Sequence, residues 1–487
     1  MKHHYNLLAV IALLLLASGC DVFQTLDQQP DNTLNRDQVF ADAEGIRNVL
    51  RGTYDDMQGF MDDYTIFAAL ASDQATHTGS FPTWQDIDNN QVSPENGTIE
   101  GPWNAIYNTI NTTNVLIERA SASEFEGLSE PAAADVRAQA RVVRAFGYHA
   151  LTRWYGGHDG LDQMGVPIIT EPTESVEDVQ LPSRSSVGDV YNQIISDLEA
   201  AEGAINSGGA IEDNPAGIGF AGQNAVRGLL ARVHLYRASI VRRAGGDPTS
   251  DYEAAASYAQ QVIQSGQYQL STLNSVYNGL NSNESIWELQ YSSQDANAMS
   301  FFARPNGEGG RLEYGLNSSF VANVDSLDDR TGANIKVAGG QPFIGKYFRL
   351  DGSDHHFVLR LPEMMLIRAE ALGELDFSNN KNEAVEYLNE IRRRAYNEAN
   401  QGGDEPDFQE AGAEIDPADV TSKQELRSLV VQERRKELAF EGHRWHDLNR
   451  LGIVQEFVNL PSDTDRRWPI PQAELDVNDN LSQNPGY

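Results

Sequence analysis

The stretch LVVQERRKELAFEGHRWHDLNRLG, residues 429–452, combines helical periodicity with an unusual density of charged side chains. Gly442, in the middle of the stretch, favours a break between two helices, because glycine adopts turn conformations at little cost. Charges packed this closely around Trp445 and several aliphatic side chains cannot all reach water, and buried charges need partners. The stretch therefore predicts two helices clamped together by a partly buried ion-pair network. An acid–base site in the same segment is the alternative.

Helical periodicity extends through most of the chain outward from this stretch. In residues 101–119, apolar and aromatic side chains recur at spacings of three and four, which predicts an amphipathic helix. Small and aromatic residues on such helices permit close antiparallel packing. The sequence therefore predicts a mainly α fold, a tetratricopeptide-like helical repeat scaffold with long loop-rich insertions and minor β-strands. The other predicted helices span 132–155, 187–205, 225–236, 251–268, 361–375, 382–396 and 424–451.

Stretches rich in Gly, Asn, Asp and Pro separate the predicted helices. Long loops on a rigid helical frame commonly carry function, so we expect the ligand-contacting residues there. Two short alternating runs, IWELQYS at 286–292 and KYFRL at 346–350, predict minor strands. The predicted loops span 72–102, 156–186, 292–345 and 401–422.

The only cysteine, Cys20, directly follows an apolar run over residues 7–17. That run has the length of a secretory signal and is too short to span a bilayer comfortably. The tetrapeptide ASGC at 17–20 resembles a bacterial lipobox, in which the cysteine is acylated and the chain is cut before it. We therefore predict a signal peptide over 1–19 and a lipid anchor, such as palmitate, on Cys20. The alternative is an ordinary signal peptide that ends in cysteine.

The charge balance and the missing motifs narrow the function. Thirty-six Lys and Arg against 71 Asp and Glu give a net charge of -35, which disfavours nucleic acid as a partner. No H-E-x-x-H or G-x-S-x-G motif occurs, so we predict no catalytic residues, no metal site and no cofactor. Asp-rich loops leave a structural Ca²⁺ open, although EF-hand spacing is absent.

Several motifs, in a specific order, resemble the SusD/RagB family over nearly the whole mature chain. They include RWYGG at 153–157, LRLPEMMLIRAEAL at 359–372, ERRKELAFEGHRWHDLNRLG at 433–452 and WPIPQAEL at 468–475. The resemblance implies a surface-exposed outer-membrane lipoprotein with four tetratricopeptide-like helix pairs on one side. Its loop-rich side would capture a nutrient, typically a glycan. It also implies a partner, a SusC-like TonB-dependent transporter.

The organisation that follows from this resemblance is one SusD-like domain over 20–487. Its N-terminal part, about 20–300, would hold the first helix pairs and ligand loops, and its C-terminal part, about 301–487, the loop insertion and the last pairs. The predicted function is non-catalytic capture of an oligo- or polysaccharide and its delivery to the transporter. The alternatives are a lipid-anchored glycoside hydrolase, a peptide- or glycopeptide-binding uptake subunit, and a structural scaffold.

The predicted ligand site rests on Trp84, in the segment HTGSFPTWQDIDNNQ at 77–91. Sugars present an apolar C–H face and a rim of hydroxyls, so a capture site needs aromatic platforms and polar hydrogen-bonding groups. No helical or alternating pattern explains an aromatic residue there. The alternative is that Trp84 pins its own segment to the helical frame. The predicted ligand-binding residues are Phe81, Trp84, Gln85, Asp86, Asn89, Phe301, Phe302, Arg304 and Tyr314.

Overall fold

The computed structural model of the chain describes residues 39–40, 42–120, 127–205, 218–280, 282–397, 408 and 412–487. Cys20 and the predicted signal peptide lie outside these residues. No helix in the described part of the chain is long and apolar enough to cross a membrane.

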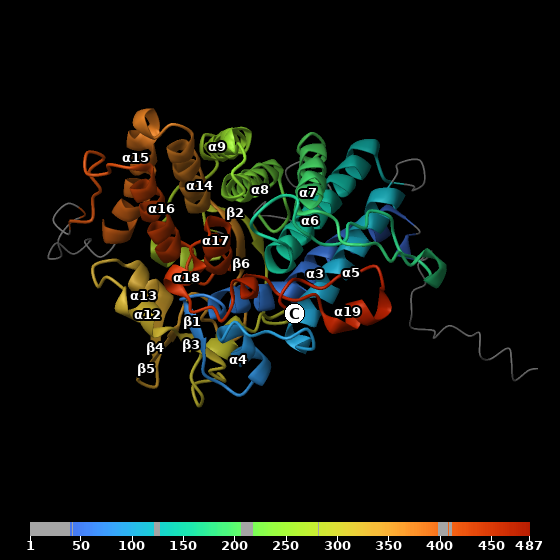
Figure 1. Cartoon of the computed structure of the whole chain (residues 1–487), viewed down its shortest axis with the longest axis horizontal. Coiled ribbons are helices and arrows are strands. Elements are labelled where there is room, and N and C mark those ends of the chain that lie inside the picture. Colours follow the sequence, from blue (N-terminus) through green and yellow to red (C-terminus); the bar gives the residue numbers. More distant parts are fainter. Residues whose placement is uncertain are drawn as a thin grey trace, which may run out of the picture.

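Long helices pack in series and make up most of the molecule (Figure 1). α3 packs on α5, α5 on α6, and so on through α7, α8 and α9 to α14, which contacts both α15 and α16. The long helices are α3 (Ala43–Leu70), α5 (Gly97–Arg119), α6 (Glu130–Tyr155), α7 (Val187–Glu202), α8 (Gln223–Arg243), α9 (Thr249–Ile263), α14 (Leu361–Leu375), α15 (Phe377–Asn397), α16 (Lys423–Glu437) and α17 (Arg444–Leu451). The shorter helical elements are α4 (Pro82–Asp88), α10 (Leu273–Asn278), α11 (Met299–Ala303), α12 (Ser318–Ala322), α13 (Arg330–Asn334), α18 (Val454–Phe457), α19 (Gln472–Val477), and the 3₁₀ turns η2 (Val176–Asp178) and η4 (Asp463–Arg466).

The helical prediction is confirmed in type for every predicted segment, and α14 has the predicted bounds. The longest helix, α3, was not predicted. Its buried residues recur at helical spacing from Ile46 to Tyr64, but Gly52 and Gly59 interrupt the sequence pattern. From Thr65 to Leu70 every residue is buried, so no polar face marks the end of the helix. The amphipathic signal is therefore weak, although the helix lies at the centre of the core.

The strands within the described ranges form three two-stranded antiparallel ladders. They are β1 (Ala75–His77) with β3 (Tyr314–Leu316), β2 (Ser285–Leu289) with β6 (His356–Arg360), and β4 (Ile335–Ala338) with β5 (Gln341–Ile344). The strand predicted at IWELQYS is confirmed as β2. The strand predicted at KYFRL is wrong, because the backbone N–H groups of Phe348 and Arg349 both donate to the carboxylate of Asp354, each at 2.6 Å, and not to a neighbouring strand.

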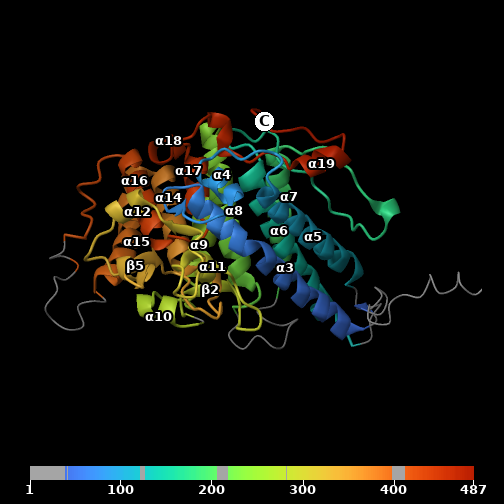
Figure 2. The ribbon, with the colours of Figure 1, turned by 90° about the horizontal axis from the view of Figure 1, so that it is seen from below.

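The predicted loops differ in how much regular structure they hold. Residues 156–186 are largely irregular, as expected. The predictions of loops over 72–102 and 292–345 are wrong in part: the first contains β1 and α4, and the second contains α11, β3, α12, α13, β4 and β5. In Figures 1 and 2 these short elements gather together to one side of the long helices. The residues predicted to bind ligand all belong to this region.

The charged stretch at 429–452 forms two helices, as predicted. Gly442 lies between α16 and α17 with φ +81°, a conformation that favours glycine, and a Cβ atom there would come within 2.9 Å of Tyr64. Asp447 pairs with Arg434 at 2.7 Å and with Arg450 at 2.9 Å, and all three side chains are almost fully buried. The predicted ion-pair network is confirmed. It is also more deeply buried than predicted.

The network extends beyond the stretch that predicted it. Arg360, at the end of β6, pairs with Glu284, Glu437 and Glu441, and Arg394 of α15 pairs with Glu284 and Glu437. These side chains come from four distant parts of the sequence, so the network joins the last helices to the β2–β6 ladder. We call this group the ion-pair core; its members are Glu284, Arg330, Lys346, Arg360, Arg394, Glu433, Glu437 and Glu441.

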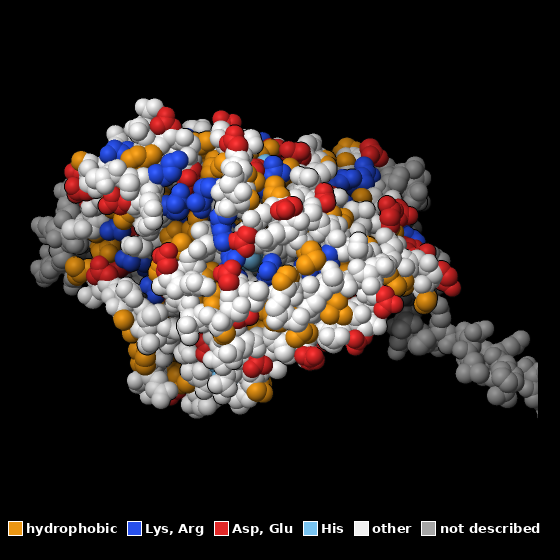
Figure 3. All heavy atoms as spheres, in the orientation of Figure 1, with side chains coloured by type: hydrophobic (Ala, Val, Ile, Leu, Met, Phe, Trp, Pro, Cys, Tyr) orange, Lys and Arg blue, Asp and Glu red, His pale blue; other side chains and the backbone are white. Residues whose placement is uncertain are grey.

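Basic side chains also gather on the surface over α14 and α17, although the chain as a whole is strongly acidic (Figure 3). On α16, Lys423 and Arg427 both lie near the carboxylate of Glu374, with Lys423 at 3.8 Å. Partly exposed cations of this kind are balanced by neighbouring acids.

Candidate functional site

The candidate site is the surface formed by β1, α4, α11, β3, β4 and β5, which we call the loop face. The β1–β3 ladder pairs Ala75 with Leu316 and His77 with Tyr314, so segments more than two hundred residues apart lie side by side. The carboxylate of Asp88, at the end of α4, accepts hydrogen bonds from the Thr76 hydroxyl and the His77 N–H, both at 2.9 Å. These contacts fix α4 against the ladder.

Aromatic side chains from the two segments meet beneath the loop face. The Trp84 ring lies 5.1 Å from Phe302, 5.2 Å from Phe81 and 6.4 Å from Tyr314, in edge-to-face arrangements. Phe67 of α3 supports the indole from below at 5.6 Å. The structure therefore brings together four of the predicted site residues. Trp84 is 6 % exposed and Tyr314 is 1 % exposed, so both rings are consumed by this packing and not displayed.

The alternative considered for Trp84, that it pins its segment to the helical frame, matches this geometry. A short helix, α4, turns the indole inward, and Pro82 in its first turn favours that helix. The polar residues around Trp84 gave no helical pattern because α4 has only two turns and one buried partner, Ile87.

Other aromatic surface on the loop face remains open to solvent. Phe301 is 45 % exposed, and its ring lies 5.5 Å from Phe302. Phe81 is half-buried, and the Arg311 guanidinium lies over its ring at 4.6 Å. Hydrophobic side chains also surface over β4 and β5 in Figure 3, where Val337 is 68 % exposed. Exposed aromatic rings beside a guanidinium offer an apolar stacking surface and hydrogen-bond donors together.

One buried carboxylate holds this part of the loop face together. Glu313 accepts hydrogen bonds from the backbone and hydroxyl of Ser80 at 2.7 and 3.1 Å, and it pairs with Arg311 at 2.8 Å. Burial would raise the pKa of Glu313, but the Ser80 hydrogen bonds and Arg311 hold it below its ordinary value. Glu313 thus stays ionised, which suits a structural acceptor and not a proton donor. The sequence pattern did not single out Arg311 or Glu313, because Ser80 and Phe81, which they contact, lie more than two hundred residues away.

Of the remaining predicted residues, some are exposed to solvent and others are held by contacts within the protein. Gln85 and Asn89 are exposed on α4 and at its end. Asp86 accepts a hydrogen bond from Asn96 at 3.2 Å, next to the start of α5. Arg304 donates to the carbonyl oxygen of Phe348 and lies 4.8 Å from the Phe343 ring, so its guanidinium is engaged beside β5.

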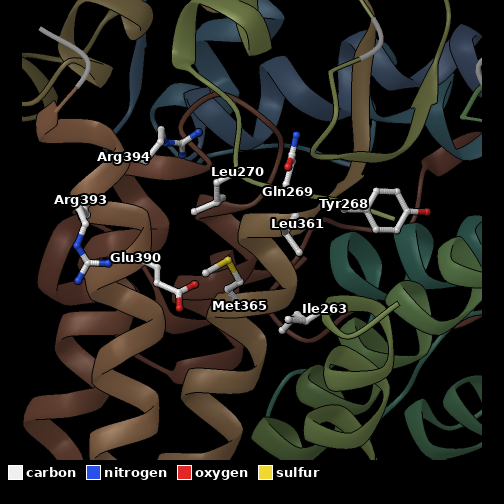
Figure 4. Close-up of a pocket in the computed structure, with 9 residues that line it drawn as sticks. All are labelled: Ile263, Tyr268, Gln269, Leu270, Leu361, Met365, Glu390, Arg393 and Arg394. Atoms are coloured by element: carbon white, nitrogen blue, oxygen red, sulfur yellow. The ribbon is translucent and has the colours of Figure 1, made fainter. Parts of the chain in front are cut away.

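In the part of the chain that the structure describes, two cavities of several hundred Å³ lie outside the loop face, and the sequence predicted neither. The first, of about 510 Å³, is a shallow hollow between the segment after α9 and helices α14 and α15 (Figure 4). Its charged residues are Glu390, Arg393 and Arg394, and Arg394 is already held by the ion-pair core. Burial and the neighbouring Glu386 raise the pKa of Glu390. The second, of about 430 Å³, lies between α5 and α19.

No group of three or more His, Cys, Asp and Glu side chains converges as a metal site within the described residues. His443 and His446, three residues apart in the sequence, are both buried. Burial and nearby arginines lower the pKa of each well below its ordinary value, so both rings are neutral. The structure therefore gives the acid–base alternative for the 429–452 stretch no exposed acid or base.

Family models match two large parts of the chain. Residues 345–464 match the SusD family, and residues 24–235 match the family described as "Starch-binding associating with outer membrane". The chain belongs to the SusD/RagB family. The first match contains most of the ion-pair core, so the motifs at 359–372 and 433–452 include buried charges of the structure.

Relatives in the SusD/RagB family align along almost the full length of the chain. SusD-like protein P2 of Formosa agariphila is 25% identical over 541 aligned positions, which cover 98% of each chain. A SusD superfamily protein from Bacteroides thetaiotaomicron, solved by crystallography, shares 22% identity and superimposes with a TM-score of 0.73, covering 91% of this chain and 100% of the other. Surface glycan-binding protein A of the same species, solved with laminarihexaose, shares 19% identity and gives a TM-score of 0.71, covering 91% and 99%. These structures share the fold.

Proposed function

We propose that the protein is a non-catalytic glycan-capture lipoprotein of the outer membrane, and that it delivers an oligo- or polysaccharide to a SusC-like TonB-dependent transporter. The observation that carries this proposal is the exposed aromatic surface of the loop face, with Phe301 and Phe81 beside Arg311. Its family membership supports the same role, and a structural neighbour was solved with a bound glucan oligosaccharide, laminarihexaose.

The loop face has the chemistry that a neutral sugar requires. The C–H face of a pyranose ring stacks on an exposed aromatic ring, and its hydroxyls need donors and acceptors at the edge. Phe301 supplies the ring, and Arg311, Gln85 and Asn89 supply polar groups. In this proposal Trp84 and Tyr314 support the binding surface from beneath. Phe302, half-buried, joins the two layers.

Capture without hydrolysis is the better match to the carboxylates of the loop face. Glycoside hydrolysis uses a pair of carboxyl groups, one of which must keep a proton as general acid. Glu313 is held ionised by its hydrogen bonds, and Asp88 is engaged by the β1 backbone. These two carboxylates therefore favour capture, and the hydrolase is the competing function that the experiment must test.

Incubation of the purified protein with laminarin and with starch separates the functions. Retention of either glycan on the protein, with no shortening of its chains, supports capture. Chain shortening supports the hydrolase. If the protein retains neither glycan but does retain a peptide or glycopeptide, the loop face takes a different nutrient and the glycan proposal is wrong.

The lipid anchor in this proposal rests on Cys20 and its preceding residues. The mature chain would run from 20 to 487 as one domain, tethered by acyl chains on Cys20. We expect Cys20→Ser either to prevent cleavage after residue 19 or to release the protein from the outer-membrane fraction. Fractionation of this variant with the outer membrane at its correct mature mass would contradict the lipoprotein assignment.

A further inference from the structure

The second cavity is a pocket between α5 and α19, closed on one side by the segment from Pro167 to Pro182. Figures 1 and 2 both show α19 beside α5, away from the loop face. The hydrogen bond from the Asn478 amide to the Pro182 carbonyl, at 3.0 Å, ties the end of α19 to that segment. The Asn111 amide makes two more hydrogen bonds, both to the backbone of Thr173, at 2.7 and 3.1 Å. The walls of the pocket are therefore held in place by polar contacts.

We propose that this pocket binds a small ligand that carries a protonated primary amine. Glu474 lines it and is half-buried, and Glu100 on α5 lies near enough to act on it electrostatically. No ion pair joins either carboxylate to a cation in the described part of the chain, and the lining contains no Lys or Arg. An ammonium group would supply the missing positive charge.

The aromatic side chains of α5 suit the same ligand. The Tyr107 ring is half-buried and lines the pocket, and the Trp103 ring, only 2 % exposed, packs behind it with the ring centres 4.9 Å apart. The Trp103 indole N–H donates to Glu474, which orients the carboxylate. The Tyr107 hydroxyl donates to the Pro167 carbonyl at 2.9 Å, so the ring is fixed. A carboxylate beside an aromatic face is favourable for an ammonium ion, which both groups attract.

The rim of the pocket is apolar, which indicates that the ligand has an apolar part as well. Leu181 is 47 % exposed and Val477 is 66 % exposed, and both line the opening. Hydrophobic and acidic side chains both reach the surface over α19 in Figure 3. The exposed amide of Asn108, on α5, adds a hydrogen-bonding group. An amine on a sugar ring or at the end of a short peptide matches this lining.

The charged surroundings of Glu474 set the expected pH dependence. Burial raises the pKa of Glu474, the Trp103 hydrogen bond opposes that rise, and Glu100 raises it further. Arg184, near Tyr107, donates its N–H groups to the carbonyls of Gly165 and Tyr155 and to others. Asp476 on α19 accepts from Gln472 at 2.7 Å. As the pH falls, Glu474 should therefore become protonated at a higher pH than an ordinary glutamate does.

The test is calorimetric titration of the full-length protein with matched ligands. A glucosamine trimer is compared with an N-acetylglucosamine trimer, and the peptide Leu-Gly-Gly with its N-acetylated form. We expect at least one amine to bind about tenfold or more tightly than its acetylated partner, which corresponds to about 1.4 kcal/mol. The trimer pair and the peptide pair distinguish a sugar amine from a peptide amine. Equal binding within both pairs, or no binding of either amine, would overturn the proposal.

Three variants locate the effect. Glu474→Gln keeps the shape and an acceptor for Trp103 but removes the charge, so the preference for the amine should disappear. Val477→Arg places a cation at the exposed rim and should also weaken amine binding. Asp479→Asn removes a charge from the exposed end of the same segment, outside the lining, and should bind like the parent. Persistence of the amine preference in Glu474→Gln, or its equal loss in Asp479→Asn, would also contradict the proposal. Laminarin binding at the loop face is unaffected by these outcomes.

Discussion

The ion-pair core buries charged side chains and the loop face exposes aromatic ones, which is the reverse of the usual placement in both regions. In the ion-pair core, Arg360 and Glu437 are at most 1 % exposed, and each charge meets several partners. On the loop face, Phe301 is nearly half exposed. Buried charges bind a structure to one arrangement, because any lost partner leaves an unpaired charge in the interior. Exposed apolar surface stabilises nothing by itself and is therefore available to a ligand.

The largest effect should follow from breaking the ion-pair core. Arg394→Ala removes a partner of both Glu284 and Glu437, and we expect it to lower the free energy of unfolding by about 3–5 kcal/mol, because buried charge is left unpaired. The neighbouring Arg393→Ala is the matched control. Arg393 is 42 % exposed and lies 3.5 Å from Glu386. Its loss should cost about 1 kcal/mol or less. Urea unfolding of both variants measures the difference, and equal costs would show that the core is no more sensitive than the surface.

Trp84→Ala should have the next largest effect. The change removes a buried indole between Phe67, Phe81 and Phe302, and we expect a loss of about 3 kcal/mol of stability through the cavity it leaves. Trp84→Phe should recover most of that loss. Differential scanning calorimetry tests both variants. A melting temperature unchanged from the parent in Trp84→Ala would mean that the indole does not support the loop face.

Phe301→Ala probes the exposed side of the loop face. Since its ring is 45 % exposed, its loss should change stability by about 0.5 kcal/mol or less. We expect binding of the captured glycan to weaken by about 1–2 kcal/mol, the scale of an interfacial aromatic contact. Val337→Ala removes apolar surface on β4 that is more exposed still, at 68 %, and is the control for general loss of hydrophobic surface. Glycan binding of Phe301→Ala at parental strength would remove this ring from the site.

The last prediction concerns Glu313, a carboxylate of the loop face that is buried and ion-paired like those of the ion-pair core. Its pKa is lowered in the folded protein, so its contribution to stability is present above the ordinary value of 4.5 and is lost as the pH falls through the folded-state pKa. Glu313→Gln should therefore cost about 1 kcal/mol at pH 7 and progressively less as the medium becomes more acidic. Urea midpoints measured from pH 7 to pH 3 test this convergence. A constant difference over that range would mean that the charge of Glu313 is not what holds Ser80.

The sequence by itself determined the helical architecture, because helical periodicity is a local property. Residues three and four apart share a face whatever the rest of the chain does, and α14 accordingly has the predicted bounds. The break at Gly442 was also local, since a positive φ favours glycine. The density of charge at 429–452 predicted ion pairs, because charges cannot be buried alone.

Only the tertiary structure decided which residues those charges and aromatic rings meet. Arg360 pairs with Glu284 and Glu441 across 76 and 81 residues of sequence, and Trp84 is buried partly by Phe302 and Tyr314 of the 299–316 segment. The exposure of Phe301 likewise depends on how distant segments pack. The same is true of the pocket between α5 and α19 that contains Glu474. Burial depends on what the fold places above a side chain. A local sequence pattern does not contain the tertiary contacts that bury a side chain. The sequence therefore indicated the segments of the loop face but not which of their aromatic rings stay exposed.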